Sequence, residues 1–189
     1  AGTVLAYDEA GAVRGNRQQL YVRALDQLEA TPIAGTEDGA NPFFSPDGKW
    51  VGFWAAGALK KVALGGGGPP VTICDVRPLL SGVGVGLFGA SWGSNDKIVF
   101  ARQWREGLWQ VPAAGGTPEP LTTLDVSKAE ASHRLPQILP GNQAILFTVT
   151  HTLLPKWDDT QVVVQSLATG ARKVLIEGGA GERHTDAGL

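Results

Sequence analysis

The sequence has one cysteine, no methionine and no long apolar run. Cys74 alone cannot form an internal disulfide, so packing and hydrogen bonds must hold the fold together. No segment approaches the roughly 18 apolar residues that a spanning helix needs, and the N-terminus lacks the basic region of a signal peptide. We therefore expect no membrane insertion by this segment. The missing methionine, absent even at position 1, indicates a processed or excised portion of a longer protein.

The sequence also lacks a strong charge of either sign. Sixteen basic and 18 acidic residues give a formal net charge of -2. Without a basic field, nucleic acid is not an expected partner, and neither is an anionic membrane surface. The 26 glycines and 12 prolines, with a hydrophobic share of 43%, favour many short strands over disorder, and no helical pattern stands out.

The clearest local pattern is a β-hairpin between residues 42 and 53. An apolar run that ends at Phe44 is followed by Pro46-Asp47-Gly48 and by a second apolar run that ends at Phe53. Pro46 presets φ for a central turn position, and Gly48 can adopt a positive φ. This pattern predicts two antiparallel strands joined by a tight turn.

The hairpin recurs along the chain. Tyr7, Phe53, Phe100 and Phe147 each end a candidate second strand, and they are separated by 46, 47 and 47 residues. A fixed period in the forties, in a sequence with many strands and few helices, is typical of β-propeller blades with four strands each. The sequence therefore predicts an all-β propeller of about four blades of four antiparallel strands.

The expected repeats span approximately residues 1–36, 37–78, 86–125 and 131–177, within a single domain 1–189. Residues 180–189 resemble the first strand of a further repeat. The N-terminal piece begins just after a hairpin turn, so it is complementary to that last strand. Two alternatives follow: a closed four-bladed ring, or an arc of a larger, six-bladed propeller.

The motifs resemble those of one known family. Residues 42–53, the glycine-rich segment 66–72, Leu108–Thr122 and Ser132–Gln137 are similar to TolB-type β-propeller repeats, as in the C-terminal sensor regions of bacterial transmembrane serine/threonine protein kinases. The resemblance covers most of the chain. It implies a six-bladed scaffold for protein or ligand contacts, of which this chain is a portion, and an extracytoplasmic, periplasmic location.

The sequence does not contain the catalytic motifs of kinases or hydrolases in a usable form. The chain has no kinase phosphate loop, His-Arg-Asp segment or Asp-Phe-Gly motif. Gly89-Ala90-Ser91-Trp92-Gly93 matches the Gly-x-Ser-x-Gly pattern of hydrolases, but that pattern needs a strand-to-helix turn. No helix is expected after Ser91, which falls in register with strand residues of the other repeats. We expect no enzyme activity from this chain.

No metal or cofactor site is expected. His133, His151 and His184 show no ligand spacing, although His133 and His184 come just before innermost strands and could face the central channel. The acidic pairs Asp8-Glu9 and Asp158-Asp159 are expected in loops after second strands, without the spacing of a calcium loop.

The candidate binding residues come from propeller geometry. The innermost strands surround a channel, and the loops at their ends form one face. The residues expected near a protein or small ligand at this channel face are Asn41, Phe43, Trp92, His133, Arg134 and Gln137.

Three functions remain open at this point. The first and preferred one is a non-catalytic binding module, such as the sensor or interaction part of a larger bacterial protein. The second is an accessory propeller domain of a hydrolase or peptidase. The third is a structural fragment completed by a second copy through open propeller edges, because an exposed apolar flank favours dimerisation.

Overall fold

The computed structural model describes residues 4–9, 18–65, 68–76, 88–102, 104–152 and 159–178. In the first strand, only the side chain of Ala6 belongs to this described part. Across these ranges the chain forms fifteen strands and a single-turn 3-10 helix. The all-β class predicted from the sequence is confirmed. None of the described residues forms a helix long and apolar enough to cross a membrane.

The strands form four antiparallel sheets, and each sheet is built from strands that follow one another along the chain. Sheet one has three described strands, and the others have four each. Sheet one contains β1 (Val4–Glu9), β2 (Gln19–Ala24) and β3 (Thr31–Pro32). Sheet two contains β4 (Ala40–Phe44), β5 (Trp50–Ala55), β6 (Ala58–Ala63) and β7 (Val71–Asp75).

The last two sheets have the same strand order. Sheet three contains β8 (Ala90–Trp92), β9 (Lys97–Phe100), β10 (Trp109–Pro112) and β11 (Glu119–Pro120). Sheet four contains β12 (Ser132–Ile138), β13 (Ala144–Thr150), β14 (Thr160–Ser166) and β15 (Arg172–Glu177). The helix η1 (Val126–Lys128) lies in the connection between β11 and β12.

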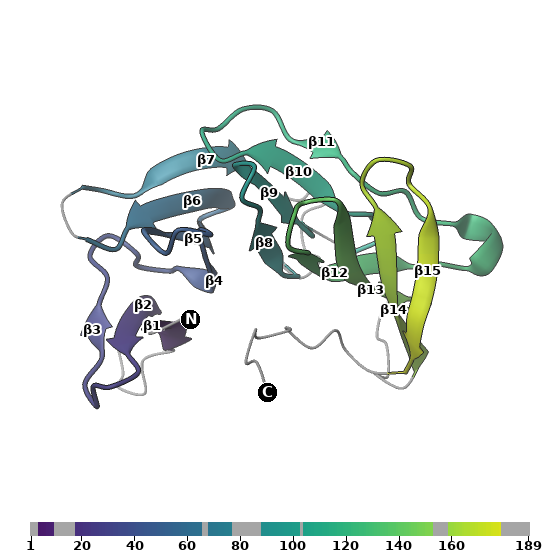
Figure 1. Ribbon diagram of the computed structural model, residues 1–189. Helices are drawn as coiled ribbons and strands as arrows, with labels where there is room; N and C mark the ends of the chain where they lie inside the picture. The colour runs from purple at the N-terminus through teal and green to yellow at the C-terminus, as the bar shows by residue number, and fades with distance from the viewer. Residues whose placement is uncertain are drawn as a thin grey trace.

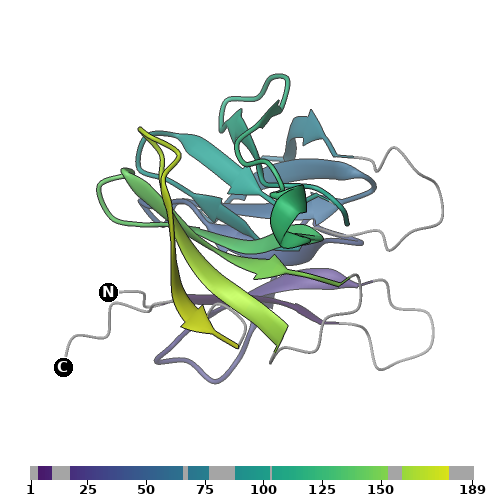
Figure 2. The same ribbon diagram turned by 90° about the vertical axis from the view of Figure 1, so that its right-hand side faces the viewer.

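The sheets follow one another in an arc, as blades do around a propeller axis (Figure 1). The innermost strands β4, β8 and β12 are neighbours in that order, and β1 lies against β4. Sheet one and sheet four stand at the two ends of the arc in this view. Viewed from the side, η1 lies on the outer surface, near sheet four (Figure 2).

Each pair of neighbouring sheets encloses its own hydrophobic cluster. Phe53 belongs to the cluster between sheets one and two, Phe100 to that between sheets two and three, and Phe147 to that between sheets three and four. All three rings are at most 1% exposed. The aromatic residues that define the repeat therefore pack each blade against the preceding one. The side chain of Tyr7 lies outside the described residues.

The hairpin turns keep one geometry although their sequences differ. The amides of Gly48, Asp96 and Asn142 each donate to the carbonyl three residues earlier, and each of these residues has a positive φ between 53° and 69°. Asp and Asn tolerate this left-handed conformation better than other residues with a Cβ. The repeat therefore keeps its register although the Ser45-Pro46-Asp47-Gly48 turn is replaced by Gly93-Ser94-Asn95-Asp96 in sheet three and by Leu139-Pro140-Gly141-Asn142 in sheet four.

Some boundaries differ from the predicted ones. Asp8 and Glu9 belong to β1, where they pair with β2, and not to a loop. The outer strand of sheet three is only Glu119–Pro120, because the amides of Leu121 and Thr122 then both donate to the Leu108 carbonyl and the chain turns toward η1. The further strand proposed for residues 180–189, together with His184, lies outside the described residues.

Candidate functional site

The Ser45–Lys49 turn is held by its own side chains. Ser45 Oγ donates to Asp47 Oδ1 at 2.6 Å and accepts from the Trp50 amide at 2.9 Å. Asp47 Oδ1 also accepts from the Lys49 amide at 3.1 Å. The Ser45 hydroxyl, and after it the Lys49 amide, hold the pKa of Asp47 below its ordinary value. The turn thus presents a fixed carboxylate beside the ring of Pro46.

A groove of about 570 Å³ opens between this turn and sheet three. It lies at the end of the sheets where the β4–β5, β8–β9 and β10–β11 turns meet, and we call it the larger groove. It is open to solvent, and its walls combine two indoles with one ammonium group and two carboxylates. Its lining residues are Ser45, Pro46, Asp47, Trp50, Lys61, Trp92, Ser94, Asp96, Ala113 and Ala114.

A second groove of about 240 Å³ continues from the first toward sheet four. The two grooves share Pro46, Trp92 and Ser94, so they form one depression across three blades. We call this second part the smaller groove. Its other lining residues are Gly93, Gln137, Ile138, Leu139, Pro140 and Asn142.

Asn142 fixes the width of the smaller groove. Its amide nitrogen donates to Ser94 Oγ at 2.5 Å, and its amide oxygen accepts from the Ser94 backbone at 3.1 Å. These two bonds join the β12–β13 turn to the β8–β9 turn. The smaller groove is therefore formed by turns that hold one another in place.

Lys61 is the cation of the larger groove. Its Nζ lies 5.0 Å from the centre of the Trp50 ring and 5.9 Å from that of Trp92, and it donates to the Ala113 carbonyl at 2.8 Å. Both rings are within cation–π range. Lys61 thereby links β6 of sheet two to the β10–β11 turn of sheet three. Trp92 Nε1 is buried and has no hydrogen-bond partner among the described residues.

The predicted site residues fall into two groups. Trp92 and Gln137 line the grooves. Phe43 is 4% exposed and packs in the core, where its ring covers Gly52 so closely that a Cβ on Gly52 would lie 2.2 Å from it. Asn41 is exposed on β4 with a φ of 53° and does not line either groove.

His133 and Arg134 lie elsewhere. Both belong to β12 itself, not to the segment before it, and both are buried, at 0% and 7% exposure. The Arg134 guanidinium lies over the rings of Phe88 and Trp104, at 4.7 Å and 4.8 Å. The structure therefore places these two side chains in packing positions, and the grooves do not include them.

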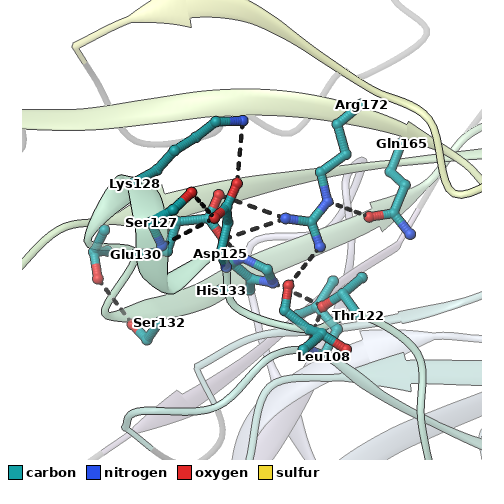
Figure 3. A network of polar contacts seen from close by, with 12 residues as sticks. Leu108, Thr122, Asp125, Ser127, Lys128, Glu130, Ser132, His133, Gln165 and Arg172 are labelled. Carbon is teal, nitrogen blue, oxygen red and sulfur yellow. Dashed lines mark hydrogen bonds and ion pairs between the residues drawn. The ribbon is translucent and has the colours of Figure 1, made fainter.

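His133 is the centre of a buried polar network that joins sheets three and four (Figure 3). Its Nδ1 lies 2.7 Å from Thr122 Oγ1, and its Nε2 lies 2.9 Å from Glu130 Oε2. The Leu108 amide donates to Thr122 Oγ1 at 2.7 Å. Arg172, on β15, reaches across to Glu130 at 3.2 Å.

The hydrogen bonds assign the protonation state of His133. The Thr122 hydroxyl accepts from Leu108 and donates to Nδ1, so Nε2 carries the ring proton and donates to the Glu130 carboxylate. Burial lowers the pKa of His133 to about 4, so the ring is neutral near pH 7. Burial tends to raise the pKa of Glu130, but the Asp125 amide, the His133 bond and the charge of Arg172 together lower it.

The order hydroxyl, imidazole, carboxylate is also that of a catalytic triad. Here, however, the Thr122 residue is 6% exposed, its oxygen already accepts from Leu108, and it does not line either groove. The Thr122 hydroxyl is therefore buried and lies outside both grooves. We infer that the network stabilises the connection between β11 and β12.

Ser91 has a structural role as well. It lies in β8, and its Oγ accepts from the Ile138 amide at 3.0 Å. This bond joins the innermost strands of sheets three and four. The Gly-x-Ser-x-Gly match is therefore a strand residue that pairs neighbouring blades.

Among the described residues, no group of three His, Cys, Asp or Glu side chains is arranged to hold a metal ion. His151 is partly exposed in the connection after β13, and Asp159 is exposed. Asp158 is outside the described part of the chain.

The prediction missed Lys61 and Trp50. Their signal in the sequence was a lysine pair in the middle of an apolar strand and a tryptophan directly after the hairpin turn. The groove itself depends on contacts between sheets, which the local pattern does not contain.

Neither a protein-family model nor a curated protein sequence matches this chain. Solved structures do match it. A protein assigned as TolB from Agrobacterium tumefaciens superposes with a TM-score of 0.73 at 16% identity, over 95% of this chain and 64% of that one. The fold is that of a TolB-type β-propeller.

Two further structures agree with this TolB-type propeller fold. TolB from Acinetobacter baumannii gives a TM-score of 0.68 at 16% identity, over 93% of this chain and 41% of that one. A chain of the nidogen/laminin complex gives a TM-score of 0.65 at 12% identity, over 92% of this chain and 62% of that one. This chain thus spans less than two thirds of each of these structures. The similarity expected from the sequence motifs is confirmed at the level of the fold.

Proposed function

We propose that this TolB-type propeller is a non-catalytic scaffold that binds a protein or ligand in the two connected grooves on its turn face. The observation that carries the proposal is the continuous depression across sheets two, three and four, with Trp92 at its middle. Binding sites are typically concave, with apolar walls and a few placed polar groups. The grooves combine indole and proline surfaces with Lys61, Asp96 and Gln137.

Two observations support a binding role over a catalytic one. Ser91 of the Gly-x-Ser-x-Gly match accepts an inter-blade hydrogen bond, and Thr122 and His133 of the Thr122–His133–Glu130 arrangement are buried. A chain of a complex between two proteins, nidogen and laminin, shares the fold. We extend the proposal to a sensor or interaction module of a larger bacterial protein that acts outside the cytoplasm.

A blocking variant tests the site. Ser94→Tyr places a bulky ring at the point that both grooves share, on an exposed turn, whereas Leu28→Tyr adds the same ring at a site that is 94% exposed in the connection between β2 and β3. A phage-displayed library of random dodecapeptides, selected on the immobilised chain, supplies the probe.

We expect selected peptides to bind the wild type and Leu28→Tyr equally and to lose at least about tenfold in affinity for Ser94→Tyr, which corresponds to roughly 1.4 kcal/mol. Peptides that bind all three proteins equally, or the absence of any selected binder, would refute the turn face as the binding site.

A further inference from the structure

Lys61 has N–H donors that the described part of the chain does not use. An ammonium group carries three N–H donors, and Lys61 gives one to the Ala113 carbonyl. No carboxylate in the described part of the chain lies within ion-pair distance of its Nζ, although the side chain is only partly exposed. The two indoles hold the charge in place without neutralising it.

The two carboxylates of the larger groove limit the charge of a ligand. The Asp47 carboxylate accepts from the Ser45 hydroxyl, and its Oδ2 lies 3.7 Å from Lys49 Nζ. Asp96 is on the exposed β8–β9 turn. With one ammonium and two carboxylates, the groove carries a formal charge of -1. A ligand with a single carboxylate can pair with Lys61, whereas a run of acidic groups meets repulsion from Asp47 and Asp96.

The shape of the depression selects an extended ligand. The larger groove passes Trp92 and continues into the smaller one, across turns from three blades. Proline and tryptophan side chains line both parts, namely Pro46, Trp50, Trp92 and Pro140. Aromatic-lined grooves accept extended, proline-containing peptides, which lose little conformational entropy on binding.

We propose that the turn face recognises an extended peptide through one acidic side chain, whose carboxylate pairs with the Lys61 ammonium between Trp50 and Trp92. This inference rests on the proposed function and adds the chemistry of the partner. The carboxylate takes the two ammonium donors that the described residues leave unused. The flanking residues of the peptide lie on the indole and proline surfaces on either side.

The test is a double-mutant cycle, with one substitution in the protein and one in the peptide. Dodecapeptides selected on the wild-type chain are synthesised with each acidic residue in turn replaced by its amide, and binding is followed by tryptophan fluorescence. Lys61→Met removes the charge and keeps most of the stem. Lys60→Met is the matched control, because Lys60 precedes Lys61 on β6 and does not line the groove.

We expect one Glu→Gln replacement in the peptide to weaken binding to the wild type and to Lys60→Met about tenfold or more, the range of a hydrogen bond to a charged group. Lys61→Met should bind the acidic and amide peptides equally, and Lys61→Arg should still distinguish them. Thermal unfolding of each variant measures the structural contribution of Lys61. If Lys61 only stabilises the contact between blades, Lys61→Met lowers the unfolding temperature but still binds the acidic peptide more tightly than its amide form.

The outcomes distinguish the two proposals. If Ser94→Tyr blocks the peptides but Lys61→Met still prefers the acidic form, the carboxylate inference is wrong and the proposed function stands. If the selected peptides contain no acidic residue on which binding depends, the inference is likewise wrong. If Ser94→Tyr blocks nothing, both proposals fail.

Discussion

His133 is enclosed by groups that fix its protonation state. Its ring is fully buried against Phe147, with the ring centres 4.7 Å apart, and both nitrogens have a partner. The charged groups around it are Glu130 and, one step further, Arg172. A neutral imidazole satisfies this site without a buried net charge. Protonation adds a charge that burial opposes.

This predicts a loss of stability in mild acid. The pKa of His133 is about 4 in the folded chain and 6.5 in the reference state. Between these values the unfolded chain binds the extra proton, so stability falls as the pH falls from about 6.5 toward 4. At pH 4.5 the loss from this residue is roughly 2–3 kcal/mol. Glu130, whose pKa is lowered, adds to the loss at still lower pH.

Urea unfolding at pH 7.5 and 4.5 measures the effect. His133→Gln keeps a donor and an acceptor but does not titrate, so its stability should depend less on pH than that of the wild type. His151→Gln, at a partly exposed site, should keep the wild-type dependence. An unchanged pH dependence in His133→Gln would contradict the assignment.

At the scale of elements, the connection between β11 and β12 holds β15, the outermost strand of sheet four, in place. β15 is exposed along its whole length and forms the rim of that sheet. Arg172 is the first residue of β15. Its guanidinium holds the strand in place by donating to the Thr123 carbonyl at 2.7 Å, to Gln165 Oε1 at 2.7 Å and to Glu130. An outermost strand has one hydrogen-bonded neighbour only, so such anchors decide how firmly it is held.

We expect Arg172→Met to loosen two segments together. Amide hydrogen exchange should quicken about tenfold or more in residues 172–177 and 123–130, since several hydrogen bonds to a charged group are lost. Lys173→Met, the neighbouring change on the same strand, should leave both segments as they are. Exchange that quickens in β15 alone would show that the connection does not depend on Arg172.

At the scale of the whole molecule, the described residues form three separate hydrophobic clusters, one between each pair of neighbouring sheets. Each sheet contacts its neighbours in sequence, so stability is expected to be distributed as in repeat proteins, with interface contributions that act mainly on adjacent units. The fully buried Phe53 and Phe147 belong to the first and the last of these interfaces.

Removing one ring should therefore weaken one end of the arc. Phe147→Ala is expected to cost about 3–5 kcal/mol, the usual range for a buried phenylalanine, and to lower exchange protection in sheets three and four more than in sheet one. Phe53→Ala should give the reverse pattern. Equal loss of protection in all four sheets for both variants would show one cooperative unit.

Much of the fold follows from the repeat. The spacing of Phe53, Phe100 and Phe147 predicts the blades because a buried ring recurs at the same place in the second strand of sheets two, three and four. The positive φ at Asp96 and Asn142 was not foreseen, because the sequence there departs from Ser-Pro-Asp-Gly and only the hydrogen-bonded turn shows the equivalence. Of the candidate site, Trp92 and Gln137 line the grooves, while His133 and Arg134 are buried by contacts between blades.

The sequence by itself determined the all-β propeller class, the register of the hairpins and the strand position of Ser91, because these depend on local turn chemistry and on a period that recurs along the chain. Only the tertiary structure decided the arc of four sheets, the burial of His133 with Thr122 and Glu130, and the Trp50–Lys61–Trp92 groove. These features join residues from different blades, and the distances between blades are set by packing, which no local pattern encodes.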